Sequence, residues 1–293
     1  MKKSVVCVLL CAIILISGCN TDSDRIKIGL VLALTGDLSS YGVAIKEGVE
    51  LAMDEVDTTR FELVFMDSKG NSKDAVSSLY SLINIHDVRY IIGDVSSSTT
   101  LSMIPIIERA DIFLLSPGAA TPQLTNISKL FARNYPSSAD ESIKSASYML
   151  NNITRECVAV IHSNDDYGIG LSKVFSEYYI EEGGDICFRE SYETGTKNFR
   201  DILARLSQLN FKAVYLSGNQ KEMGAFIRQY REYGFNQKVI ANMAFLEDDC
   251  IKVAGDAAEG VIIPIVKYDI DDNSLFLITL RINITLFQHW LML

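Results

Sequence analysis

Short runs rich in β-branched residues alternate with longer stretches of helical periodicity, and this alternation occurs twice along the chain. Such strand–helix–strand repeats build parallel sheets with helices on both faces. In the first half we expect strands at 26–34, 61–66, 90–92 and 112–115, and helices at 41–56, 72–86 and 99–109. In the second half we expect strands at 157–161, 186–188, 213–217, 239–241 and 261–263, and helices at 168–182, 198–209 and 221–233. The sequence therefore predicts two similar α/β lobes, joined near residues 133–138.

The N-terminus has the layout of a secretory signal. Lys2 and Lys3 precede an apolar run that is too short for a good membrane span, and a Ser-Gly pair then precedes Cys19. This order resembles a bacterial lipobox, in which Cys19 is diacylated and becomes the mature N-terminus. The alternative is an uncleaved anchor with an incidental cysteine. Either way, the body is predicted to lie outside the cytoplasm, attached to a membrane only by its N-terminus.

The cysteines of the body do not have metal-binding spacing. Cys157, Cys187 and Cys250 are far apart, there is no CxxC pair, and the three histidines are scattered. No metal and no cofactor are predicted from this pattern. Cys157 and Cys187 are interpreted as small apolar filler in strands, and a single disulfide among the three cysteines stays open.

Charge and motif content argue against nucleic-acid binding and against catalysis. The net charge is −10 without a basic run, which argues against nucleic acid and against an anionic membrane surface as partners. The chain has no GxGxxG, phosphate-loop or GxSxG motif. Paired acids such as Asp165 and Asp166 are sequence neighbours, and neighbouring side chains on a helix point apart. No catalytic residue is predicted.

Hydroxyl-rich segments follow five of the predicted strands, at 35–42, 93–100, 116–122, 162–168 and 217–219. In parallel α/β sheets, ligands bind beyond the carboxyl ends of the strands. The run at 96–100 also opens a helix, where free backbone N–H groups and hydroxyls suit a carboxylate or another compact anion. Each segment alone is also typical of turns and helix caps. The convergence of all five predicts a binding site.

Six segments resemble the branched-chain amino-acid-binding proteins that serve ABC importers, in that family's order and at its spacing. They are IKIGLVLALTGDLSSYGVAIKEGVELAMDEV, IIGDVSSSTTLSMIPI, FLLSPGAATPQLT, VAVIHSNDDYGIGLSKVF, NFRDILARL and GDAAEGV. The resemblance implies the two-lobed periplasmic-binding-protein fold of type I. It also implies that a small solute is sealed between lobes that close about hinges near Pro136 and Pro264, and is then handed to a membrane permease.

The resemblance further implies ligand-binding residues. Ser97 and the backbone of Gly118 and Ala120 stand where the family grips an α-carboxylate. Tyr41 and Tyr167 stand where its aromatic side chains line the cleft.

Three positions depart from the family's pattern. Ala120 stands where the family has a threonine, although Thr121 follows directly. A cleft tyrosine of the family's second lobe aligns with Asn219. The acidic partner of the ligand's ammonium aligns with Met243. A buried ammonium without a counter-charge is costly, so either Glu247 or Asp248 replaces the acid, or the ligand lacks an α-amine. We favour a ligand other than a simple branched-chain amino acid: an amide, a different amino acid or a carboxylic acid.

The segment after residue 268 departs from the family altogether, and residues 274–293 match nothing in it. We expect a shifted reading frame or a truncated gene, so that lobe one lacks a strand and covering helices and exposes apolar surface and a sheet edge. The expected organisation is a signal peptide at 1–18, a tether at 19–25, lobe one at 26–136, lobe two at 137–264, and a crossing with a non-family tail at 265–293.

The expected function is that of an extracytoplasmic solute-binding lipoprotein that delivers an amino acid, amide or carboxylate to an ABC permease. The alternative is a ligand sensor of the same fold that reports to a membrane kinase or regulator, and an enzyme is the least favoured hypothesis. The expected partners are the small-molecule ligand and the permease, with membrane contact through the lipid anchor alone. The protein is expected to be a monomer.

Overall fold

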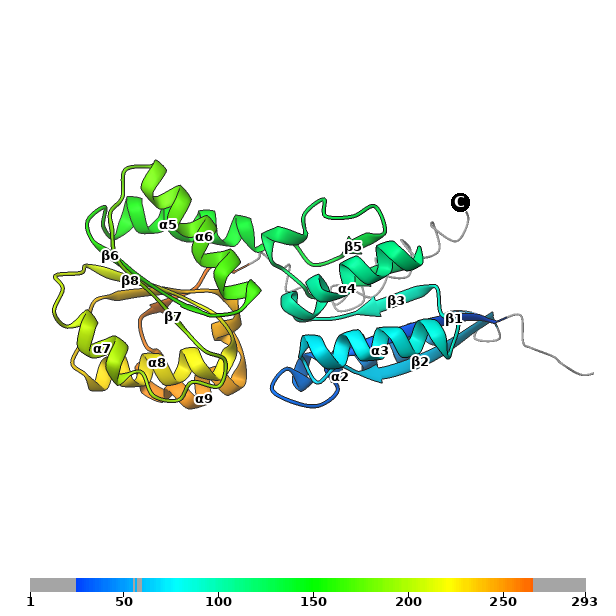
Figure 1. Ribbon diagram of the computed structural model, residues 1–293. Helices are drawn as coiled ribbons and strands as arrows, with labels where there is room; N and C mark the ends of the chain where they lie inside the picture. The colour runs from blue at the N-terminus through cyan, green and yellow to red at the C-terminus, as the bar shows by residue number, and fades with distance from the viewer. Residues whose placement is uncertain (1–24, 55, 57–59, 266–293) are drawn as a thin grey trace, which may run out of the picture.

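The computed structural model describes residues 25–54, 56 and 60–265 of the chain. Within that range, two α/β lobes lie side by side (Figure 1). The predicted signal peptide, almost all of the tether, the lipidation site at Cys19 and the tail from residue 266 onward lie outside the described residues.

Lobe one is built on a five-stranded parallel sheet with the strand order β2-β1-β3-β4-β5. Its strands are β1 (Ile26–Leu32), β2 (Phe61–Asp67), β3 (Tyr90–Gly93), β4 (Phe113–Ser116) and β5 (Phe131–Arg133). Strand β1 pairs with β2 on one side and with β3 on the other. The strand order therefore reverses beside β1, which is where a doubly wound sheet opens a crevice for a ligand.

Helices cover the two faces of this sheet unequally. On one face, α3 (Ser72–Asn84) and α4 (Ser97–Ala110) form a core with the sheet that includes Leu79, Leu82, Met103 and Ile107. On the opposite face lies α2 (Ser39–Met53), whose buried residues are both glycines.

Lobe two repeats the design with a parallel sheet in the order β10-β9-β8-β6-β7. Its strands are β6 (Val158–Ser163), β7 (Ile186–Tyr192), β8 (Ala213–Ser217), β9 (Lys238–Ala241) and β10 (Val261–Ile262). Helices α5 (Ser138–Asn152) and α6 (Asp166–Glu181) form one core with the sheet. Helices α7 (Arg200–Leu206), α8 (Gln220–Glu232) and α9 (Asp248–Ala254) form another. The predicted fold class, two parallel sheets flanked by helices, is confirmed.

All of the predicted strands and helices are present, with ends that differ by a few residues. The sequence pattern does not indicate β5, α5 or α9. Helix α5 escapes the pattern because its buried face carries small polar residues, including Ser138, Ser142 and Ser145, where apolar periodicity would be the usual signal. The junction between the lobes is the short segment between the end of β5 at Arg133 and the start of α5.

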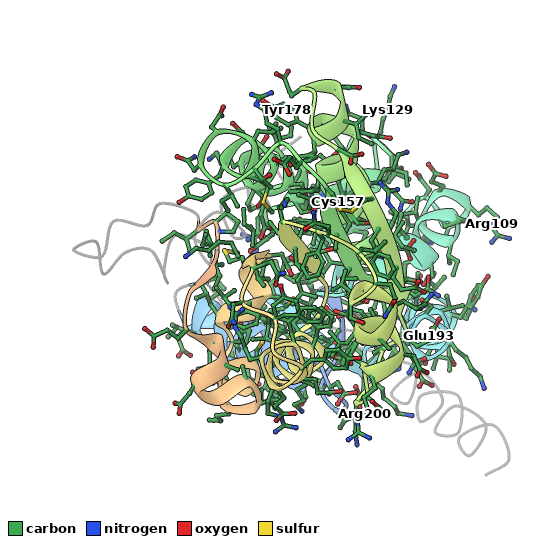
Figure 2. The ribbon with its side chains drawn as sticks, turned by 90° about the vertical axis from the view of Figure 1, so that its left-hand side faces the viewer. Arg109, Lys129, Cys157, Tyr178, Glu193 and Arg200 are labelled. Carbon is green, nitrogen blue, oxygen red and sulfur yellow. A yellow bond between two sulfur atoms is a disulfide. The ribbon has the colours of Figure 1, made fainter. Side chains whose placement is uncertain are left out.

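The interpretation of Cys157 and Cys187 as apolar filler is wrong. The two residues form a disulfide across the β6–β7 edge of lobe two, with a Cα–Cα distance of 5.1 Å (Figure 2). Neighbouring parallel strands hold the two Cα atoms within the usual range for a disulfide. The third cysteine, Cys250, is free and buried.

Candidate functional site

A cavity of about 1560 Å³ is lined by the loops that follow the strands of both lobes. It is bordered by seven of the eight residues singled out as ligand-binding in the sequence: Tyr41, Ser97, Gly118, Ala120, Tyr167, Asn219 and Met243. These residues come from six separate segments, so the fold brings them together from across the chain. Thr121 is the exception.

The lobe-one wall presents hydrogen-bond donors at the start of α4. Ser96 caps this helix, and its side chain accepts from the Thr99 N–H at 3.5 Å. No described residue accepts a hydrogen bond from the N–H groups of Ser97 and Ser98, as is usual for the first turn of a helix. The Ser97 Oγ accepts from the Thr121 N–H at 3.2 Å, which leaves its hydroxyl proton available to a ligand.

The loop after β4 adds a further donor beside this helix. Ala120 is 4% exposed, and none of the described residues accepts from its N–H. Gly118 allows the loop to approach the loop after β3, because a Cβ at this position would lie 2.7 Å from Val95 Cγ2. The result is a compact cluster of N–H and O–H donors at the start of α4, and the neighbouring Asp94 carboxyl is buried, which raises its pKa. Such a cluster suits an anion.

Thr121 faces the junction between the lobes and does not line the cavity. Its Oγ1 is buried without a hydrogen-bond partner, and it would lie 2.8 Å from a Cβ at Gly170 of α6. The Arg133 guanidinium holds the same loop by donating to the carbonyls of Ala119 and Thr121, at 3.2 and 2.8 Å. The inclusion of Thr121 among the ligand-binding residues is therefore not supported by its position.

The lobe-two wall is organised by paired polar side chains. The Asp165 carboxylate caps α6 through Gly168 N–H at 2.8 Å and accepts from Asn219 Nδ2 at 2.6 Å. Asn242, which the sequence pattern does not single out, donates to Tyr167 Oη at 3.1 Å. Burial raises the pKa of Tyr167 well above its ordinary value, so the phenol stays protonated and can both donate and accept.

An acid from α5 stands directly behind Met243. The Glu141 carboxylate accepts a hydrogen bond from the Met243 N–H. Burial raises the pKa of this carboxyl to about 7, opposed by that hydrogen bond. Glu141 shares a helical stripe with the buried Ser138, Ser145 and Met149. An acid at that spacing is the signal that could have identified it in the sequence.

The cavity extends from the polar cleft along the apolar face of α2. Ile45 and Val49 of α2 line this extension, together with Ile28 and Leu63 from the sheet beneath. Ile45 and Val49 lie four residues apart in α2, so their side chains share one face of the helix. The structure shows that this face borders open space.

Two contacts join the lobes at the rim of the cleft. The Asp166 N–H at the start of α6 donates to Ser98 Oγ at 3.2 Å. Lys221 Nζ of α8 lies 4.0 Å from Asp37 Oδ1 of lobe one. Residues of the two lobes thus approach each other at two places beside the cavity.

Comparison with known proteins assigns this architecture. The sequence model of the family described as "Periplasmic binding protein" matches residues 25–274. This chain belongs to that family.

The relatives of this periplasmic binding protein are named for amino acids. It is 28% identical to the Leu/Ile/Val/Thr-binding protein of Salmonella typhimurium, over 82% of this chain and 68% of the relative. The crystal structure of leucine-binding protein LivK from Thermotoga maritima superposes with a TM-score of 0.76 at 26% identity, over 83% of this chain and 70% of that chain. A solute-binding protein from Rhodopseudomonas palustris, in complex with 3,4-dihydroxybenzoic acid, shares the fold at a TM-score of 0.72 and 24% identity, covering 81% of this chain and 67% of that chain.

The family and its members bind substrates and are not enzymes, so this chain is a binding protein. As a member of a periplasmic family, it acts outside the cytoplasm. Among the helices that the structure describes, none combines the length and apolar composition needed to cross a membrane. Within the same residues, no group of His, Cys, Asp and Glu side chains could hold a metal ion.

Proposed function

We propose that this protein captures a small polar solute bearing a carboxylate between its lobes and delivers it to an ABC importer. The observation that carries the proposal is the donor cluster formed by the first turn of α4, the Ser97 hydroxyl and the Ala120 N–H. These donors border a cavity whose opposite wall comes from the other lobe. Closure about hinges near Pro136 and Pro264 would bury the solute.

Ligands of the relatives support an anionic group as the common element. The Salmonella and Thermotoga proteins are named for amino acids, and the Rhodopseudomonas structure contains an aromatic acid. All of these compounds carry a carboxylate. A carboxylate at the start of α4 gains both charge-assisted hydrogen bonds and a favourable helix dipole.

Binding can be tested by thermal unfolding and titration calorimetry on the full-length chain in detergent, with the common L-amino acids, their amides and aromatic carboxylates as probes. A compound at a hundred times its dissociation constant stabilises the folded state by about 2.7 kcal/mol. We expect acids to raise the midpoint and their amides to have little effect.

The variant Ser97→Ala removes one donor to the solute and should weaken binding of an acid roughly 10-fold or more. Ser207→Ala is the matched control, because Ser207 is exposed at the end of α7, away from the cavity. Amides that bind as well as acids would contradict the proposed binding of an anion by the donor cluster. A Ser97→Ala variant with unchanged affinity would contradict it as well.

We also propose that Cys19 carries the lipid that tethers the protein to the membrane. The basic start, the apolar run and the Ser-Gly-Cys sequence support it. Cys19→Ala should move the protein from the membrane fraction to the soluble fraction, and continued membrane retention of this variant would argue for an uncleaved anchor.

A further inference from the structure

We propose that Asp94, which lies behind the first turn of α4, makes the affinity for the solute's carboxylate depend on pH, because its own side chain must be neutral when that carboxylate binds. This inference rests on the proposed function and adds a residue that controls the same donor cluster without touching the solute.

The carboxyl of Asp94 occupies the same end of α4 as the donor cluster. One of its oxygens accepts from the Val95 N–H, and the side chain lies within hydrogen-bonding reach of the Ser96 N–H and the Thr99 hydroxyl. Val95 and Ser96 line the cavity, whereas Asp94 is fully buried behind them. A solute carboxylate bound at the first turn of α4 would therefore have a second acid behind the wall on which it rests.

Burial makes a charge on Asp94 costly. Its pKa is raised above the ordinary value of 3.8 because the carboxyl is withdrawn from water. A solute carboxylate at the same helix terminus would raise this pKa further, since like charges disfavour each other's ionised form, and more strongly away from water. Anion binding and ionisation of Asp94 therefore oppose each other, and an acid that binds should draw a proton onto Asp94.

Charged neighbours do not neutralise Asp94. Among the described residues, no Lys, Arg or His forms an ion pair with it. Lys69 is exposed and pairs with Asp74 at 3.5 Å, and the loop after β4 has no titratable side chain. The other titratable residues on the elements around Asp94 are Lys27 of β1, Asp37 and Tyr41 near the start of α2, Glu62 and Asp67 of β2, Lys73 and Tyr80 of α3, Tyr90 of β3, Glu108 and Arg109 of α4, Arg133 of β5, Tyr135 after it, and Asp165, Asp166 and Tyr167 near the start of α6. An ionised Asp94 would thus lack a counter-charge within this described shell.

The surroundings of Asp94 suit both of its protonation states. The Ser68 hydroxyl bonds to Asp94 Oδ2 and also accepts from the Gly70 N–H at 3.2 Å. A hydroxyl can turn to donate to an ionised carboxylate or to accept from a neutral carboxyl. The main chain is fixed at the same time, because the Asp94 carbonyl accepts from Ser116 Oγ at 2.8 Å and from Thr100 Oγ1 at 3.2 Å. The side chain can therefore change its charge in place.

The experiment measures the affinity of the full-length chain for carboxylates by calorimetry between pH 5 and 8, with L-leucine, benzoate and 3,4-dihydroxybenzoate as probes. Below the pKa of Asp94 its side chain is neutral, so wild-type affinity should be highest at pH 5 and should fall as the pH rises, by up to about 10-fold per pH unit. Titrations in buffers with different heats of ionisation should show that the wild type takes up as much as one proton per solute bound.

The variant Asp94→Asn removes the charge and keeps an oxygen that accepts from Val95. At pH 8 it should bind the probe at least about 10-fold more tightly than the wild type, with a flatter pH profile and a smaller proton uptake. Glu141→Gln is the matched control, because it removes the other described carboxyl whose pKa is raised. This control should keep the fall in affinity and the proton uptake, and it tests the inference even if Asp94→Asn does not fold.

The pH profile and the proton uptake separate a charge from a merely structural role, which would move neither. The inference is overturned if wild-type affinity does not fall between pH 5 and 8, or if Asp94→Asn shows the same fall as the wild type. Loss of the fall in Glu141→Gln would also overturn it, because the titrating group would then lie in lobe two. In each of these cases a carboxylate still binds, so the proposed function stands. If no probe binds, or if amides bind as tightly as acids, the proposed function fails and this inference fails with it.

Discussion

The two lobes share one topology but differ in how completely their sheets are covered. In lobe two the central strands β6 and β8 are buried at each position, between one core formed with α5 and α6 and another formed with α7, α8 and α9. In lobe one, the central strand β3 alternates between half-buried and buried residues, and the core described there lies on the side of α3 and α4. The α2 side opens into the cavity.

This difference shows that strand order alone does not determine how completely a parallel sheet is covered. Parallel strands are apolar on both faces and need cover on both. Lobe one satisfies this on one face, and on the other it leaves apolar side chains of α2 and the sheet bordering the cavity. The truncation predicted from the sequence, and the apolar surface expected from it, stay predictions.

The largest expected effect comes from equal truncations in the two lobes. Leu203 is fully buried in the core of lobe two, whereas Leu63 is half-buried and lines the cavity of lobe one. Leu203→Ala should lower the free energy of unfolding by about 3–4 kcal/mol, because it creates a closed void. Leu63→Ala should cost about 1 kcal/mol, because its side chain already borders open space.

Urea unfolding followed by circular dichroism measures both variants against the wild type. Equal losses in the two variants would mean that the α2 face of lobe one is covered in solution, and the contrast between the lobes would disappear.

The disulfide should produce the next largest effect, confined to lobe two. The Cys157–Cys187 bridge closes a loop with a sequence separation of 30, and lobe one has no cysteine between residues 26 and 136. Replacing both cysteines by alanine should cost about 3 kcal/mol by relaxing the unfolded chain. A reductant should lower the unfolding midpoint of the wild type by a similar amount and leave the double variant unchanged. A wild type that is insensitive to reductant would show that the bridge contributes little.

The fold was predictable because its signals are local and repeated. Apolar runs with the periods of strands and helices specify β1, α3 and β8 to within a few residues. The same signal fails at α5, where buried serines occupy the core-facing stripe. The disulfide also escapes the pattern, since pairing depends on which strands become neighbours and spacing along the chain does not reveal it.

The site was predictable where it follows strand ends and unpredictable where it depends on packing between elements. Ser97 and Gly118 could be placed because loops after parallel strands converge. Thr121 does not line the cavity, because its hydroxyl turns towards Gly170 of the other lobe. The sequence did not identify Glu141 and Asn242, because their places beside the cavity depend on contacts with residues distant in sequence. Glu141 contacts Met243, and Asn242 contacts Tyr167.

The partly buried acid Glu141 of lobe two should have the smallest effect on the free energy of unfolding, with a pH dependence of definite sign. The folded-state pKa of Glu141, about 7, is higher than its ordinary value of 4.5. The folded state therefore holds this proton more tightly than the unfolded chain does. The associated stability is fully present below pH 4.5 and is lost as the pH rises through 7. In the same lobe, burial lowers the pKa of His162, which acts in the opposite sense by destabilising the protein as the pH falls.

The variant Glu141→Gln isolates the contribution of Glu141 from that of His162, because His162 is present in both proteins. Without ligand, the variant should be more stable than the wild type at pH 8 by about 2 kcal/mol, and the difference should shrink towards pH 5. Urea midpoints between pH 5 and 8 measure this difference directly. A constant difference across that range would mean that Glu141 is solvated in solution, and the acid would then resemble the half-exposed side chains of lobe one more than the closed core of lobe two.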